Sequence, residues 1–90
     1  MPQNYKIVFS PKSKKDIKKI DKKIQIKIIE KISLLSSNFD LISPSIKKLI
    51  ASANASHRLR IGNYRVLYDI YHKDKAILII RIGHRKDVYK

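Results

Sequence analysis

The stretch HRLRIGNYRVLYDI, residues 57–70, reads as two alternating strands joined at Gly62-Asn63. Glycine at the first central position suits a two-residue type II′ turn, and such a turn fixes the register of the two strands. The predicted cross-strand pairs are Ile61 with Tyr64, Arg60 with Arg65, Leu59 with Val66, Arg58 with Leu67, and His57 with Tyr68. We expect the rest of the chain to support this hairpin.

Neighbouring pairs of the hairpin point to opposite faces of the sheet. One face carries side chains that can pack on a core: His57, Leu59, Ile61, Tyr64, Val66 and Tyr68. The other face carries Arg58, Arg60, Arg65 and Leu67. Two of these arginines lie directly opposite each other, and like charges so placed destabilise a sheet by roughly 0.2–1 kcal/mol. A chain that keeps such a cluster is expected to bind an anion there.

The length and composition indicate one small globular domain, residues 1–90, with a large excess of positive charge. The chain has 21 Lys and Arg against 7 Asp and Glu, a formal net charge of +14, which favours nucleic acid or an acidic protein segment as partner. Biased Lys-Ile composition explains some of the lysines but not the clustered arginines. The absence of cysteine excludes disulfides and thiolate chemistry, and no apolar run is long enough for a membrane span. MPQNYKIVFS also lacks the apolar core of a signal peptide, so we expect a cytoplasmic protein.

The N-terminal half predicts a strand followed by helix. Tyr5–Phe9 reads as a short strand, and Ser10 before Pro11 is typical of a helix start. Isoleucines then recur at helical spacing, with two further residues widening the stripe: Ile17, Ile20, Ile24, Ile28 and Ile32, then Ile29 and Leu35. Asp21 can cap a second helix, so one long helix and a helical hairpin are both compatible with the pattern. The intervening lysines are expected to form a solvated face.

The C-terminal half predicts a loop and three strands. Residues 36–45 read as a loop, a short basic segment follows at residues 46–50, and residues 72–75 form a turn that leaves His72 exposed. Residues 76–83 (AILIIRIG) fit a strand buried on both faces apart from Arg81, which is expected to pair with an acid such as Asp69. The expected fold is a small antiparallel-rich β-sheet packed against N-terminal helices, with strand, helix or helices, and three strands in order.

The enzyme sites that are easiest to recognise are absent from the sequence. No carboxylates are paired, and the histidines lack the spacing of a metal site. Gly62 and Gly83 are the only glycines, which excludes a phosphate-cradling loop. A basic and aromatic group remains: if the last strand runs beside the hairpin, His84, Arg85 and Tyr89 join its arginines. Cleavage of RNA suits such a group, because the neighbouring 2′-hydroxyl attacks the phosphate and fixed cations stabilise the developing charge without a cofactor.

The chain resembles a known family in its C-terminal half. HRLRIGNYRVLYDI followed by IIRIGHRKDVY is similar to RelE/ParE-type toxins of toxin–antitoxin pairs. SIKKL before the hairpin, the Tyr5 strand and the Ser10-Pro11 helix start also resemble that family. The resemblance implies a β-α-α-β-β-β order, in which a sheet cups a basic site and two N-terminal helices lie behind it. It is specific in Arg58–Tyr68 and Arg81–Tyr89, and weak in the helices.

RelE-like members cleave mRNA in the ribosomal A site and are silenced by a bound antitoxin. The resemblance therefore implies a ribosome-dependent, metal-independent endoribonuclease without a cofactor. Its partners would be mRNA, the ribosome and an acidic or amphipathic antitoxin, the last in a hetero-oligomer. It implies catalytic roles for Arg58, Arg60, Arg65, Arg85 and Tyr89, and RNA binding by Lys47, Lys48 and His84.

One departure from the family concerns the proton transfer. The best-known RelE pattern has lysines where Arg58 and Arg60 stand, and arginine hardly deprotonates, so Tyr89 or His84 would have to move the proton. Two other functions remain open at this point. One is a ParE-like inhibitor of DNA gyrase, and the other is a non-catalytic basic protein that binds RNA or the ribosome.

Overall fold

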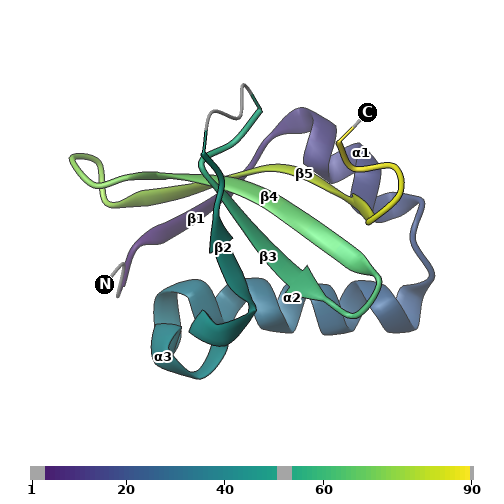
Figure 1. Cartoon of the computed structure of the whole chain (residues 1–90), viewed down its shortest axis with the longest axis horizontal. Coiled ribbons are helices and arrows are strands. Elements are labelled where there is room, and N and C mark those ends of the chain that lie inside the picture. Colours follow the sequence, from purple (N-terminus) through teal and green to yellow (C-terminus); the bar gives the residue numbers. More distant parts are fainter. Residues whose placement is uncertain (1–3, 51–53, 90) are drawn as a thin grey trace.

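The computed structural model describes residues 4–50 and 54–89 and has the α+β fold that the sequence predicts (Figure 1). The helical elements are α1 (Pro11–Lys18), α2 (Lys22–Ser37), α3 (Phe39–Ile42) and the 3₁₀ turn η1 (Ser43–Ser45). The strands are β1 (Lys6–Phe9), β2 (Ile46–Lys48), β3 (His57–Ile61), β4 (Tyr64–Tyr71) and β5 (Ala76–His84).

The five strands form one sheet in the order β1-β5-β4-β3-β2. β1 pairs with β5 in parallel, and the other neighbours are antiparallel. The observed register of β3 and β4 confirms all five predicted cross-strand pairs. Gly62 has a φ of 57° whereas Asn63 has no positive φ, as a type II′ turn requires.

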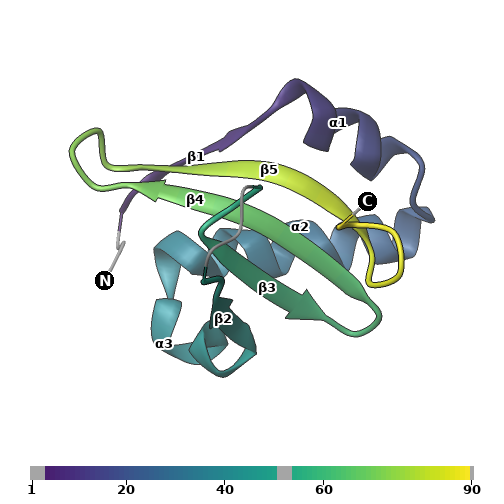
Figure 2. The same ribbon diagram turned by 45° about the horizontal axis from the view of Figure 1, so that its top comes forward.

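The main core lies between the sheet and α2, which crosses one face of the sheet (Figure 2). Ile28, Ile32 and Leu35 of α2 are buried against one side of β3, β4 and β5. The sheet contributes Leu59, Ile61, Val66, Tyr68, Ile77, Ile79 and Ile82 to this core. Ile29 was expected in the helical stripe but is 43% exposed, so the buried stripe is narrower than predicted. None of the described helices has the length and apolar character needed to cross a membrane.

The N-terminal helical segment is two helices, which decides between the two alternatives left by the sequence. Ser10 caps α1 by accepting a hydrogen bond from Ser13 N, with Pro11 at the first helical position. α1 ends at Lys18, and the Asp21 side chain caps α2 by accepting a hydrogen bond from Lys23 N at 3.2 Å. The capping residues therefore set the boundaries of both helices.

Two expectations for the middle of the chain are wrong. Residues 36–45 are mostly helical rather than a loop, because α2 extends to Ser37 and the α3 and η1 turns follow directly. The basic segment after them contains the edge strand β2, so four strands rather than three follow the helices. β2 has three residues, two of them lysines, which is too short a segment for an alternating pattern to show in the sequence.

A β-bulge in β5 sets the direction of Arg81. Leu67 pairs with Arg81 but the next residue, Tyr68, pairs with Ile79, so Ile80 is the extra residue. The bulge changes the phase of the strand: Ile77, Ile79 and Ile82 face the main core, and Arg81 lies beside Leu67 on the other face. Only the side toward α2 is fully buried, so the expectation of a strand buried on both faces is wrong.

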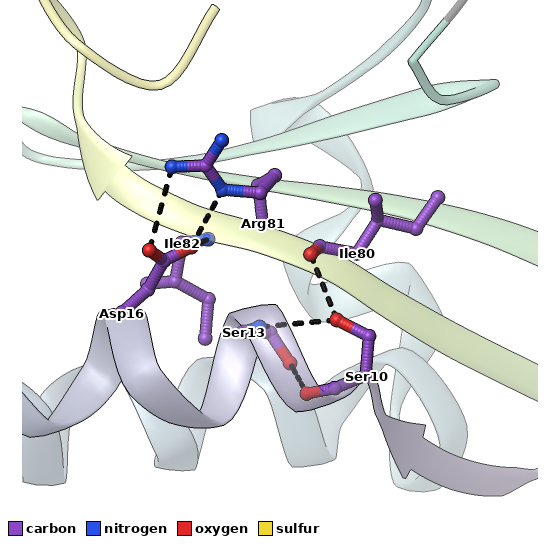
Figure 3. A network of polar contacts seen from close by, with 6 residues as sticks. All are labelled: Ser10, Ser13, Asp16, Ile80, Arg81 and Ile82. Carbon is purple, nitrogen blue, oxygen red and sulfur yellow. Dashed lines mark hydrogen bonds and ion pairs between the residues drawn. The ribbon is translucent and has the colours of Figure 1, made fainter.

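Helix α1 continues along the edge of β5 where β1 ends (Figure 3). The Ser10 hydroxyl donates to Ile80 O at 2.9 Å, and the Asp16 carboxylate accepts from Ile82 N at 3.0 Å. Asp16 also accepts from Arg81 Nε at 2.8 Å, so Arg81 pairs with an acid as predicted, but the acid is Asp16 and not Asp69. Asp69 instead accepts a hydrogen bond from Ser56 N at 2.7 Å.

The face of the sheet opposite α2, here called the open face, carries a second and smaller apolar cluster. Ala55, Leu67 and Val88 are buried in it, with Leu49 and Ile80 packed at its margin. Val88 belongs to the C-terminal tail, residues 85–89, which turns back over the end of β5. The cluster therefore fixes the tail against the open face.

Candidate functional site

The arginines of this chain gather on the open face and the tail. Register across the sheet places Lys47, Arg58, Leu67 and Arg81 in one row running over β2, β3, β4 and β5. The adjacent row contains Arg60, Arg65 and Gly83. Arg85 follows in the tail. Each arginine in the sequence thus lies on this one surface, and Asp16, an acid beside it, is already paired with Arg81.

Arg65 lies at the centre of this arginine cluster. Partial burial is the main cause that lowers the pKa of the Arg65 guanidinium from its usual value, and the positive charges of Arg58, Arg60 and Arg85 lower the pKa further. Tyr89 acts in the opposite direction and raises the Arg65 pKa. These five side chains are therefore close enough to act on one another electrostatically, although they come from two strands and the tail.

The hydrogen bonding of two of these arginines, Arg65 and Arg58, leaves their positive charges without a carboxylate partner among the described residues. Arg65 Nη1 donates to the carbonyl oxygens of Gly62, at 2.8 Å, and of Tyr64, at 2.9 Å, which fixes the guanidinium beside the hairpin turn. Arg58 Nε is buried and has no acceptor among the described residues. A buried donor without a partner costs roughly 1–3 kcal/mol. The positive charges of this cluster are therefore kept together at a cost in stability.

The tail is fastened at both ends of its turn. Arg85 N donates to Asn63 O at 2.8 Å, which ties the tail to the hairpin turn. Val88 is 2% exposed and lies over Gly83, where an added Cβ would be 3.6 Å from the Val88 Cβ. Tyr89 follows with 48% of its surface exposed. The tail therefore brings Arg85 and Tyr89 to the arginine cluster while leaving the Tyr89 ring accessible.

The predicted RNA-binding residues divide between the two faces. Lys47 pairs with Arg58 and lies on the open face. Lys48 pairs with His57 and lies on the α2 face, where its charge is the second cause, after burial, that lowers the His57 pKa. His84 also lies on the α2 face, with its ring against Tyr64 at 5.7 Å, edge to face. The structure thus brings Lys47 to the arginine cluster but not Lys48 or His84.

A hollow of about 330 Å³, which could not be predicted from the sequence, lies beside the cluster. It is lined by Lys12, Asn54, Ile80, Arg81, Val88 and Tyr89. Lys12 was not among the predicted site residues, because only the docking of α1 on β5 brings this lysine to the hollow. Across residues 4–50 and 54–89, no three His, Asp or Glu side chains come together as a metal site requires.

Known proteins resemble this chain over nearly its whole length. Residues 7–89 match the family model described as ParE toxin of type II toxin-antitoxin system, parDE. The chain belongs to this family. The toxin RelG of Mycobacterium tuberculosis is 25% identical over 87 residues, which cover 96% of this chain and 97% of RelG. The chain is therefore a RelE/ParE-family toxin of a type II toxin–antitoxin system, and the resemblance found in the sequence is confirmed.

Solved structures of RelE proteins have the same fold. The toxin–antitoxin complex RelBE2 from Mycobacterium tuberculosis contains a chain with a TM-score of 0.76 and 24% identity, covering 94% of this chain and 95% of that one. The RelB–RelE antitoxin–toxin complex from Methanococcus jannaschii matches with a TM-score of 0.71 and 28% identity, covering 92% of this chain and 95% of that one. The α+β sheet and its covering helices are thus a shared architecture of these toxins.

Proposed function

We propose that this RelE/ParE toxin is a ribosome-dependent mRNA endonuclease. The main support is that four arginines and one tyrosine lie close together: Arg58, Arg60, Arg65, Arg85 and Tyr89. The charges of the other three arginines lower the pKa of Arg65, and Tyr89 raises it. Arginine binds phosphate through parallel N–H···O bonds and stays charged at physiological pH. Fixed cations of this kind stabilise the extra negative charge that forms on a phosphate under attack.

The proposed reaction uses the 2′-hydroxyl of the RNA itself. The 2′-oxygen bonds to the adjacent phosphorus, the bond to the 5′-oxygen breaks, and the products end in a 2′,3′-cyclic phosphate and a 5′-hydroxyl. Arg65 and Arg85 bind the phosphate under attack, and Arg58 and Arg60 bind the neighbouring phosphates of the RNA. The 2′-hydroxyl loses its proton and the leaving 5′-oxygen gains one, so the site needs a group that exchanges protons.

Tyr89 is our candidate for the proton transfer. Arginine hardly deprotonates, and His84 lies on the α2 face with its ring against Tyr64. Among the groups whose charge acts on the Arg65 pKa, Tyr89 is the one that is not an arginine, so it is the one that can exchange a proton. This assignment narrows the choice between Tyr89 and His84 that the sequence left open.

To test the nuclease, mRNA is incubated with the purified protein, with and without ribosomes, and the ends of the RNA products are mapped. We expect ribosome-dependent cuts, and Arg65→Ala or Arg85→Ala should reduce the cleavage rate by about 10²–10³-fold, the usual cost of losing one group that stabilises transition-state charge. Lys73→Ala is the matched control, because it removes one positive charge from the exposed β4–β5 turn. Full cleavage by both arginine variants would contradict the site.

A second candidate function is inhibition of DNA gyrase, favoured by the match of residues 7–89 to the ParE toxin family model. A supercoiling assay with the same preparations separates the two functions. Inhibited supercoiling without mRNA cleavage would replace the nuclease with the gyrase inhibitor. A non-catalytic RNA-binding role predicts neither, but if four arginines contact phosphates, log affinity for single strands should still fall with log salt at a slope of about −3.

We further propose that an antitoxin with an acidic or amphipathic segment holds this toxin in a cytoplasmic hetero-oligomer. The solved relatives described above are toxin–antitoxin complexes. A formal net charge of +14 favours association with a negatively charged partner. Stable production of the wild-type chain alone in growing bacteria would contradict this proposal together with the toxicity that motivates it.

A further inference from the structure

The turn between β3 and β4 contacts both arginines that are proposed to bind the phosphate under attack. Three consecutive carbonyl oxygens, those of Gly62, Asn63 and Tyr64, make these contacts. Arg65 Nη1 donates to the first at 2.8 Å and to the third at 2.9 Å. Arg85 N donates to the second at 2.8 Å, so the tail begins beside the turn (Figure 2). One short turn therefore holds both a side chain of β4 and the first residue of the tail.

The bonds to the turn decide which edge of the Arg65 guanidinium can meet a ligand. A guanidinium has five N–H donors in a planar fork, and both bonds to the turn come from Nη1, so neither uses Nε or Nη2. Nε and Nη2 lie on one edge and can bind two oxygens of one anion in parallel. Arg81 uses this same edge on the Asp16 carboxylate, at 2.8 and 3.4 Å (Figure 3). An anion on Arg65 is therefore expected at its Nε–Nη2 edge.

The positive charges around Arg65 explain why this side chain needs to be held. Arg60 lies directly opposite it in the hairpin. The charges of Arg58 and Arg85 act on the same guanidinium. Like charges so close repel one another, so an arginine side chain without other contacts would turn away into solvent. Hydrogen bonds from a charged group to carbonyl oxygens stabilise the guanidinium in place, and they leave its charge available for a ligand.

The positions of the three carbonyl oxygens depend on Gly62. Its φ is 57°, whereas Asn63 has no positive φ, as a type II′ turn requires. An L-residue rarely adopts such a φ, whereas a D-residue adopts it readily. Gly62 is exposed, and a Cβ added there would meet no atom of the described residues within 4 Å. A side chain at this position therefore acts through the backbone conformation and not through a clash.

We propose that the β3–β4 turn is a positioning element of the RNA site. The carbonyl oxygens of residues 62 and 64 orient Arg65 so that its Nε–Nη2 edge meets the phosphate under attack. The carbonyl oxygen of Asn63 fixes the start of the tail, from which Arg85 reaches the same phosphate. Gly62 and Asn63 are thus positioning residues, which act through the two arginines. This inference rests on the proposed function, because it takes a phosphate of RNA as the ligand.

The handedness of residue 62 tests the turn. Chemical synthesis of the full chain gives Gly62→Ala with either L-alanine or D-alanine, and ribosome-dependent cleavage is measured at a temperature at which circular dichroism shows every variant folded. The L-alanine variant should lower kcat by about 10- to 100-fold, because misplacing a positioning contact by about 1 Å costs up to about 10²-fold. KM should change by less than about threefold, because the other basic side chains still bind the RNA. The D-alanine variant should match the wild-type chain within about twofold.

A second turn with a positive φ supplies the control. Lys75 lies in the turn between β4 and β5, at the other end of β4, and has a φ of 50°. Lys75→Val places a β-branched residue at that φ, so it should lower Tm and leave kcat unchanged. If Gly62 served stability alone, the L-alanine variant would behave in the same way. Equal kcat values for the L-alanine and D-alanine variants would overturn the proposal.

Arg65→Lys tests the guanidinium edge without a change in the turn. Lysine keeps the positive charge but has no planar fork, so it cannot bond to the turn and also bind two phosphate oxygens in parallel. We expect kcat to fall by about tenfold or more, because the charge is no longer fixed where the transition state needs it. A wild-type kcat would overturn the assignment of the Nε–Nη2 edge.

Magnetic resonance of the arginine Nε–H groups separates this inference from the nuclease. Arg65→Lys identifies the Arg65 signal by its loss, and an RNA with 2′-O-methyl groups throughout is a ligand that cannot be cleaved. This RNA should shift the Arg65 signal in the wild-type and D-alanine chains, and shift it less in the L-alanine chain. That result in a chain that does not cleave mRNA would support the turn's role and remove the nuclease. Cleavage by the wild-type chain with no shift of the Arg65 signal would overturn the inference and leave the nuclease standing.

Discussion

Replacing Asp16 with alanine tests the contact between α1 and the edge of β5. The Asp16 carboxylate accepts hydrogen bonds from Arg81 Nε, Arg81 Nη2 and Ile82 N. The Asp16 and Arg81 side chains are only 13% and 22% exposed, so solvent screens their pairing incompletely. Removing one partner of a buried ion pair costs about 3–5 kcal/mol, and a hydrogen bond to a charged group contributes about 1.5–3 kcal/mol. Because this pair retains some exposure, we expect Asp16→Ala to lower the free energy of unfolding by about 2–4 kcal/mol.

Thermal unfolding followed by circular dichroism measures this loss. In a domain of this size, 1 kcal/mol corresponds to about 4–8 °C in Tm, so Asp16→Ala should lower Tm by roughly 8–32 °C. Asp16→Asn keeps one side-chain oxygen as acceptor and should lose about half as much. Asp74→Ala is the control, because it removes an equal charge from the exposed turn after β4.

The control also accounts for the added self-repulsion of a chain that is already strongly positive. A Tm for Asp16→Ala within about 3 °C of that for Asp74→Ala, less than the shift for 1 kcal/mol, would refute the reasoning. In that case the three hydrogen bonds would not fasten α1 to the sheet.

Three further predictions concern stability. The buried Tyr68 hydroxyl has no partner among the described residues, so Tyr68→Phe should leave stability in urea unchanged or raise it by up to about 1 kcal/mol; a loss above 1 kcal/mol would reveal a hidden partner. Burial, followed by the charge of Lys48, lowers the pKa of His57, so the unfolded chain binds the proton more readily. Stability should then fall as pH drops below about 6.5, and urea unfolding of His57→Gln at pH 7.5 and 5 should show a smaller fall. Gly62 has a φ of 57° and open space around its α-carbon, so Gly62→Ala should cost about 1–2 kcal/mol through backbone strain alone, and an unchanged urea midpoint would contradict the turn type.

The parts of the fold that local chemistry determines could be predicted from the sequence. The glycine at position 62 selects the turn, the turn fixes the register, and alternation along the strands then assigns every side chain from His57 to Tyr68 to a face. Ser10 and Asp21 mark the helix starts in the same local way. These features depend on neighbours within a few residues, so a single sequence contains them.

Features that depend on contacts between residues far apart in the chain could not be predicted from the sequence. The pairing of Arg81 with Asp16 joins residues 65 positions apart, and it follows from a bulge at Ile80 that the run of apolar residues conceals. The same limit applies to the site. The arginines of the hairpin could be grouped from their register, but the placement of His84 on the α2 face and of Lys12 beside the hollow depends on how β5 and α1 dock.

The position of α1 along β5 also has a consequence for self-association. A strand edge with free N–H and C=O groups invites pairing with another chain, and β5 is the longest strand of this sheet. Beyond the end of β1, the side chains of Ser10 and Asp16 bond to backbone groups of Ile80 and Ile82 that another copy could otherwise pair with. The two outer strands are short: β1 has four residues, and β2 has three, two of them lysines. The sheet therefore offers little edge for aggregation during any period in which the toxin is free of its antitoxin.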